Sequence, residues 1–140
     1  MYLSSGLKLR TDRWYAWTMY PGYGDEPYRS LIRIDAIKPL KTGQGLIRLN
    51  FLNAFYAVGV RQFDIVLRTL KRSPNFIALE PYVDKKPKNR LVVIHEVSVP
   101  WMRSVWPEAL EDAREHDLSG DALQLLIGRK IRELFSHDYG

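Results

Sequence analysis

Hydrophobic and polar positions alternate with a period of two through most of the first hundred residues. Between residues 28 and 37, Ile32, Ile34 and Ala36 alternate with Arg33 and Asp35. This alternation is typical of a half-buried strand, and similar stretches recur along the chain. The pattern predicts strands at 13–20, 28–37, 46–52, 63–71, 76–83 and 91–99. Residues 53–62 fit a strand extended through a bulge, a separate short strand or a single helical turn.

The period changes after Pro100. Pro107 suits a first helical turn, and Ser119 is a plausible N-cap for a final helix. Apolar residues then recur at helical spacing, which indicates a stripe that packs against the sheet. The members of this stripe are Leu123, Leu126, Ile127, Ile131, Leu134 and Phe135. Between strand and helix, Trp101 and Trp106 are expected to plug the end of a barrel.

These elements predict an α+β fold that is mostly β. Short connections favour antiparallel neighbours, so we expect a five-to-seven-stranded meander or small barrel followed by two C-terminal helices. A length of 140 residues suits a single domain. Within it, 1–100 forms a β-rich part and 101–140 a helical part.

The distribution of charge separates the same two parts. Residues 1–100 hold 16 Lys and Arg against 8 Asp and Glu, whereas residues 101–140 hold 5 against 8. An excess of positive charge on the β-rich part favours an anionic partner such as nucleic acid, a nucleotide or a membrane surface. Charge that only keeps the protein soluble is the alternative.

Aromatic residues are concentrated in residues 13–30, which hold six of the seventeen in the chain. In a strand at 13–20, Trp14 and Ala16 share one face, while Tyr15 and Trp17 share the other. One face is expected in the core. The second either forms a stacking platform for bases or lies beneath the C-terminal helices.

The predicted nucleic-acid contacts combine rings of this stretch with basic residues of strands and loops. They are Arg10, Arg13, Tyr15, Trp17, Arg29, Arg33, Lys38, Lys41, Arg48, Lys71, Arg72, Lys85, Lys86 and Lys88. In a simple meander the loops near 38–45 and 72–75 meet at one end, and loop 84–90 lies at the other. A solvated loop is the alternative interpretation of the lysine run.

No catalytic or cofactor motif is present. The chain has no cysteine, and its three His-acid pairs match no compact metal-ligand spacing, so no metal or other cofactor is expected. His95 shares its predicted strand face with Leu91 and Val93, which indicates a core-facing ring. A pocket containing His95 and Glu80 is the basis for an enzymatic alternative.

We therefore expect a non-enzymatic binding module for nucleic acid, single-stranded or RNA, or for another polyanion, within a larger assembly. A protein-interaction subunit without nucleic-acid contact is one alternative. A small-molecule-binding barrel or enzyme around His95 is the other. The longest uncharged stretch, 49–60, is too short for a membrane span, and the start resembles no signal peptide, so a cytoplasmic location is expected.

Overall fold

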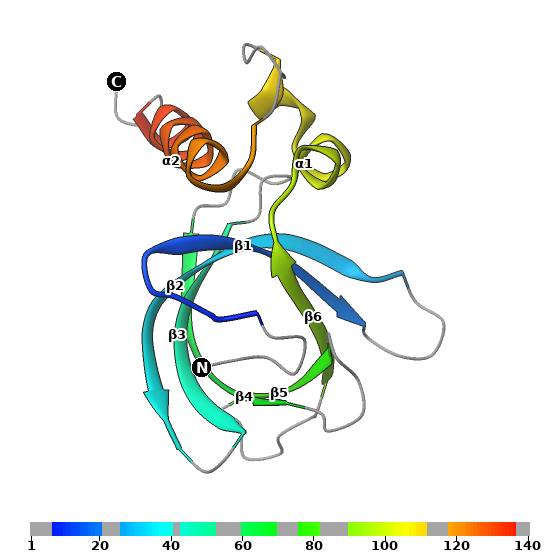
Figure 1. Ribbon diagram of the computed structural model, residues 1–140, viewed down its shortest axis with the longest axis vertical. Coiled ribbons are helices and arrows are strands. Elements are labelled where there is room, and N and C mark those ends of the chain that lie inside the picture. The colour runs from blue at the N-terminus through cyan, green and yellow to red at the C-terminus, as the bar shows by residue number, and fades with distance from the viewer. Residues whose placement is uncertain are drawn as a thin grey trace.

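Six antiparallel strands form a closed barrel in the computed structural model, which describes residues 7–20, 26–40, 43–52, 60–69, 76–81, 90–111 and 118–136. The strands are β1 (Arg13–Tyr20), β2 (Tyr28–Pro39), β3 (Gln44–Leu52), β4 (Val60–Thr69), β5 (Phe76–Pro81) and β6 (Arg90–Glu96). Each strand pairs with the next, and β6 closes the ring against β1 (Figure 1). The prediction of a mostly β fold with an antiparallel barrel is confirmed.

The barrel interior is the first of two hydrophobic cores. One face of β1 contributes Tyr15 and Trp17, which are 0% and 1% exposed. The Trp17 ring meets Phe51 of β3 edge-on, with ring centroids 4.9 Å apart. Leu9 precedes β1 and is also buried there, because the start of the described chain enters the ring of strands (Figure 1).

The hydroxyl of Tyr15 holds this entering segment in place. It accepts a hydrogen bond from the Arg10 N–H at 2.8 Å and donates one to the Lys8 carbonyl oxygen at 3.3 Å. Burial raises the pKa of Tyr15, so its hydroxyl stays protonated and can donate a hydrogen bond. The tyrosine is therefore part of the barrel core and not of a surface.

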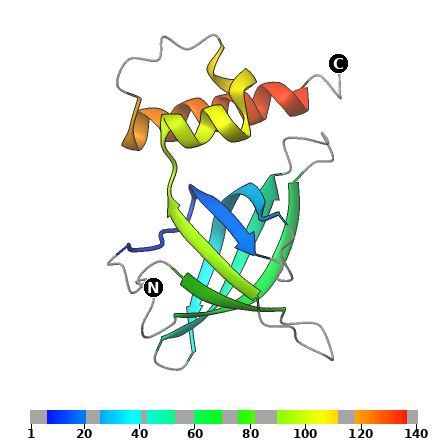
Figure 2. The same ribbon diagram turned by 90° about the vertical axis from the view of Figure 1, so that its right-hand side faces the viewer.

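A helical layer covers the other face of β1. It consists of α1 (Val99–Val105), the 3-10 turn η1 (Pro107–Leu110) and α2 (Gly120–Ser136), and the two longer helices lie side by side above β1 (Figures 1 and 2). Trp14 and Ala16 of β1 form a second core with these elements. The alternative in which C-terminal helices cover the second face is thus confirmed. The stripe of α2 is confirmed at Leu123, Leu126, Ile127, Ile131 and Leu134, whereas the Phe135 side chain lies outside what the structure describes.

The segment after β6 differs from the prediction. The strand ends at Glu96 instead of continuing to 99. Helix α1 begins at Val99, because the Ser98 side chain accepts a hydrogen bond from the Trp101 N–H and Pro100 suits the first turn. Trp101 and Trp106 belong to the helix-sheet core, so neither plugs the barrel. Among the described helices, none is long and apolar enough to cross a membrane.

A β-bulge also changes one predicted face. Pairing between β2 and β3 shifts between Ile34 and Ala36, so Asp35 is the additional residue. After the bulge Ala36 is exposed and Ile37 packs against the barrel core, which reverses the predicted alternation at these two positions.

Candidate binding groove

A groove lies between the start of β1 and helix α2, where β6 leaves the barrel. Pairing of β1 with β6 begins at Tyr15 and Glu96, so Trp14 has no partner in β6. The side-chain amide of Gln124 takes the place of the missing strand. It accepts from the Trp14 N–H at 2.8 Å and donates to the Trp14 carbonyl oxygen at 2.7 Å. Two hydrogen bonds therefore fix α2 to the edge of the strand.

Two adjoining hollows form this groove, and they share Arg10, Arg13 and Asp121 in their walls. The larger has a volume of about 470 Å³, and its lining also includes Thr11, Asp12, Trp14, Arg33, Gln124, Leu125 and Gly128. The smaller has a volume of about 360 Å³ and also borders on Leu7, Lys8 and Glu96. We refer to both together as the barrel-helix groove. Both hollows are widely open to solvent.

One wall of the barrel-helix groove is formed by α2, where Leu125 and Gly128 lie beside the polar side chains of Asp121 and Gln124. We call Leu125 and Gly128 the apolar strip. Leu125 is 74% exposed, although it lies on a helix that has a well-buried stripe on its other side. Gly128 lies one turn further on, and a Cβ atom built there would meet no atom within 4 Å. A glycine inside a helix costs about 0.5–1 kcal/mol relative to alanine. No neighbouring atom therefore requires a glycine at this position, and the absence of a side chain leaves this part of the groove unfilled.

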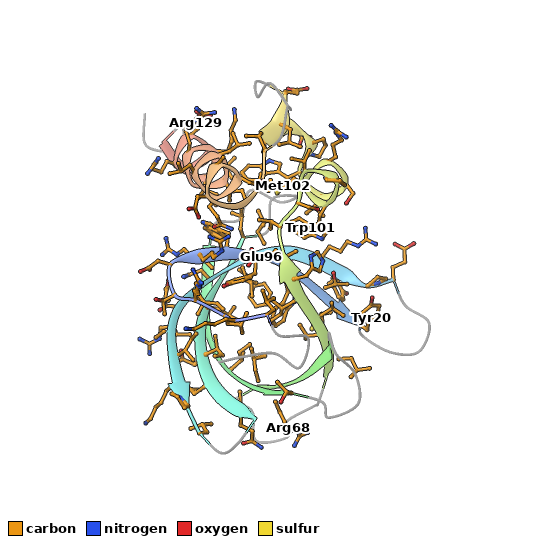
Figure 3. All side chains as sticks on the ribbon, viewed as in Figure 1. Tyr20, Arg68, Glu96, Trp101, Met102 and Arg129 are labelled. Atoms are coloured by element: carbon orange, nitrogen blue, oxygen red, sulfur yellow. The ribbon has the colours of Figure 1, made fainter. Side chains whose placement is uncertain are left out.

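The opposite wall is cationic and is centred on Arg13. The guanidinium lies 3.2 Å from Glu96 of β6 and 3.2 Å from Asp121 of α2, so it joins the barrel to the helix. Burial alone would lower the pKa of Arg13, but the two carboxylates outweigh burial and raise the pKa. Arg13 therefore remains charged in the groove. Figure 3 shows Glu96 at the end of β6, where the chain turns away toward Trp101.

Two further arginines border the same groove. The Arg33 guanidinium lies over the Trp14 ring, 5.8 Å from its centroid, and forms an ion pair with Asp35 at 3.2 Å. The guanidinium of Arg10 is exposed and forms an ion pair with no other residue that the structure describes. Of the three arginines, Arg10 is thus the most available to an incoming anion.

Beside the groove, the bulge residue Asp35 is held by three neighbours. Its carboxylate accepts from Asn50 Nδ2 at 2.6 Å, from Gln62 Nε2 at 2.8 Å and from Arg33 Nε at 3.2 Å. Partial burial alone would raise the pKa of Asp35, but these hydrogen bonds and the charge of Arg33 outweigh it and lower the pKa. The carboxylate joins β2, β3 and β4, which indicates a structural role.

The predicted nucleic-acid residues that the structure describes do not gather on one face. Tyr15 and Trp17 are sealed inside the barrel, so the prediction that these two rings stack on bases is wrong. The alternation assigned them correctly to one face of the strand, but that face is the interior. Arg10, Arg13 and Arg33 come together in the barrel-helix groove.

The other predicted cations within the described ranges lie outside the groove. Arg48 forms an ion pair with Asp64 across β3 and β4, whereas Arg29 and Lys38 are exposed on β2 and form an ion pair with no residue in the described ranges. The predicted contacts that lie outside the described residues are Lys41, Lys71, Arg72, Lys85, Lys86 and Lys88.

His95 is also placed differently from the prediction. Val92 and Ile94 face the barrel core, so the His95 ring lies on the outer face of β6. There it meets the Trp101 ring edge-on, with ring centroids 6.2 Å apart. Its Nδ1 lies 2.9 Å from the Glu96 carbonyl oxygen, and the ring lines neither hollow of the groove. Residues 91–94 are apolar on both faces of the strand, so their pattern does not show which face is the interior, and His95 was assigned to the wrong one.

Several groove residues carry no motif in the sequence and were missed there. Gln124 and Asp121 are examples. Leu125 and Gly128 did have a signal, because Leu125 lies outside the apolar stripe of the predicted helix and Gly128 interrupts its interior. Within the described ranges, no three His, Asp or Glu side chains are grouped so that they could hold a metal ion. No family model, curated protein or solved structure matches this chain.

Proposed function

We propose that this chain is a non-enzymatic protein-interaction module and that a segment of its partner binds in the barrel-helix groove. The observation that carries the proposal is the open apolar strip of α2. Leu125 is exposed to water, and Gly128 leaves space that no side chain fills. An exposed leucine alone needs no explanation, but this leucine borders a groove that Arg10, Arg13 and Arg33 also line, which supports a contact site.

Selection of binding peptides tests this proposal even though the partner is unidentified. A displayed library of random twelve-residue peptides would be selected on the immobilised protein, and the affinity of the most enriched peptide would be measured by fluorescence anisotropy. Gly128→Phe fills the groove with a ring, and we expect it to weaken binding at least tenfold.

Ala122→Phe is the matched control for this test. Ala122 is exposed on the same helix but does not line the groove, so its variant should bind as the parent does. Urea unfolding would verify that both variants fold. A selection that yields no peptide sensitive to Gly128→Phe would contradict the proposal.

A polyanion is the second candidate ligand, supported by cations that form no ion pair within the described residues, namely Arg10, Arg29 and Lys38. Since Tyr15 and Trp17 are buried, such binding would depend on phosphate contacts, which are largely indifferent to sequence. We expect twenty-nucleotide single-stranded RNA and DNA to bind alike, with an affinity that falls steeply between 50 and 200 mM salt. Titration at both salt concentrations is the measurement, and no binding at 50 mM would remove this candidate.

A further inference from the structure

The ion pair between Arg13 and Asp121 lies at the mouth of the barrel-helix groove. The Asp121 side chain is 96% exposed, yet one of its oxygens lies 3.2 Å from the Arg13 guanidinium. An ion pair this exposed to water contributes little to stability, so another carboxylate can replace Asp121 at low cost. Glu96 holds Arg13 from the other side and would keep the guanidinium in place during the exchange.

The groove sets an anion-binding group beside an apolar surface. Arg10 lines both hollows and forms no ion pair within the described residues, and it shares the larger hollow with Leu125 and Gly128. One ligand in this hollow can therefore meet a guanidinium at one end and the apolar strip at the other. Arginine is well suited to this role because its planar group binds a carboxylate through two parallel hydrogen bonds.

The charge of the groove argues against a chain of phosphates. Asp12, Glu96 and Asp121 also line its walls, and they would repel closely spaced negative charges. A single carboxylate can contact Arg10 and Arg13 while it displaces only Asp121. The apolar strip then remains available for a hydrophobic side chain of the same ligand.

We propose that the barrel-helix groove recognises a partner segment in which an acidic residue lies close to a large apolar residue. The acidic side chain binds Arg10 and Arg13, and the apolar side chain lies against Leu125 above Gly128. Asp121 pairs with Arg13 in the free protein and is displaced on binding. This inference rests on the proposed interaction function and adds the chemistry of the ligand and the competition by Asp121.

The peptides enriched by selection on the immobilised protein provide the first test. We expect most of them to carry Asp or Glu within about three residues of Leu, Ile, Phe or Trp, because Arg10 and Leu125 line the same hollow. With the most enriched peptide as the probe, Arg10→Gln should weaken binding at least fivefold. Arg29→Gln is the charge-matched control outside the groove and should bind as the parent does.

The second test examines the competition. Asp121→Asn removes the internal carboxylate, so we expect it to bind the same peptide about two- to fivefold more tightly, the range that an exposed ion pair allows. Suppose that Gly128→Phe weakens binding but the peptides lack acidic residues, or that Arg10→Gln and Asp121→Asn leave the affinity unchanged. Either result overturns the carboxylate inference, while the groove remains an interaction site. If no peptide depends on Gly128, both proposals fail. Groove-dependent binding of a twelve-nucleotide oligothymidine in place of peptides would also overturn the inference.

Discussion

At the scale of single residues, Gln124 of α2 makes two hydrogen bonds to the backbone of β1. Its amide satisfies both the N–H and the carbonyl oxygen of Trp14, at the point where β6 no longer pairs with β1. We expect Gln124→Ala to lower the free energy of unfolding by about 1–3 kcal/mol, because two partly buried backbone groups lose their partners. Urea unfolding followed by tryptophan fluorescence measures this change.

The neighbouring Leu125→Ala is the control for that measurement. Since Leu125 is exposed, its replacement should change the free energy of unfolding by less than about 0.5 kcal/mol. Equal stabilities of the Gln124 and Leu125 variants would show that the hydrogen bonds to Trp14 do not stabilise the fold.

Tyr15 makes a second prediction at the same scale. Tyr15→Phe keeps the ring in the core but removes the oxygen that accepts from the Arg10 N–H. We expect a loss of about 1 kcal/mol in stability and faster hydrogen exchange at the Arg10 amide. Tyr28→Phe, at an exposed position, should change neither. Unchanged exchange at Arg10 would mean that Tyr15 does not hold the entering segment.

At the scale of elements, Asp35 links stability to pH through the three strands it joins. The pKa of Asp35 is lowered in the folded protein from its ordinary value of 3.8. Its contribution is therefore fully present above about pH 4 and is lost as pH falls below 3.8 through the folded-state pKa. Protonation of the carboxylate removes the charge that Asn50, Gln62 and Arg33 stabilise.

Asp35→Asn should accordingly be less stable than the parent by about 1 kcal/mol at pH 7, since hydrogen bonds to a charged group are lost. The difference should shrink as pH falls from 3.8 through the lowered folded-state pKa, because the unfolded parent is protonated first and the folded carboxylate only at lower pH. Urea unfolding at pH 7 and pH 3 measures both values. A constant difference at the two pH values would show that the charge of Asp35 does not stabilise the strands.

Local patterns predicted these elements well where one face is polar. Richness in Trp, Tyr and Thr located β1, whose two faces are both buried. Alternation located β2 and β3 to within a few residues, and helical spacing located the stripe of α2. It failed where both faces are apolar, as at His95 on β6, and at the Asp35 bulge, which one additional residue creates. Helix α1 had its own signal in Ser98 and Pro100, but the strong strand pattern before it obscured that signal.

At the scale of the whole molecule, β1 separates two cores. Its inner face closes the barrel with Tyr15 and Trp17, and its outer face holds the helical layer with Trp14. The sequence showed that aromatic side chains point both ways, but it could not show that helices cover the outer face. The barrel-helix groove arises from contacts more than one hundred residues apart, which local patterns do not reveal.

The most direct test of the central claim is hydrogen exchange of the full chain with and without the most enriched peptide. We expect slower exchange in the two segments that form the groove, 10–14 and 121–128, and little change elsewhere. Protection confined to another surface, such as the barrel end that exposes Tyr20 and Leu91, would contradict the assignment of the barrel-helix groove as the binding site.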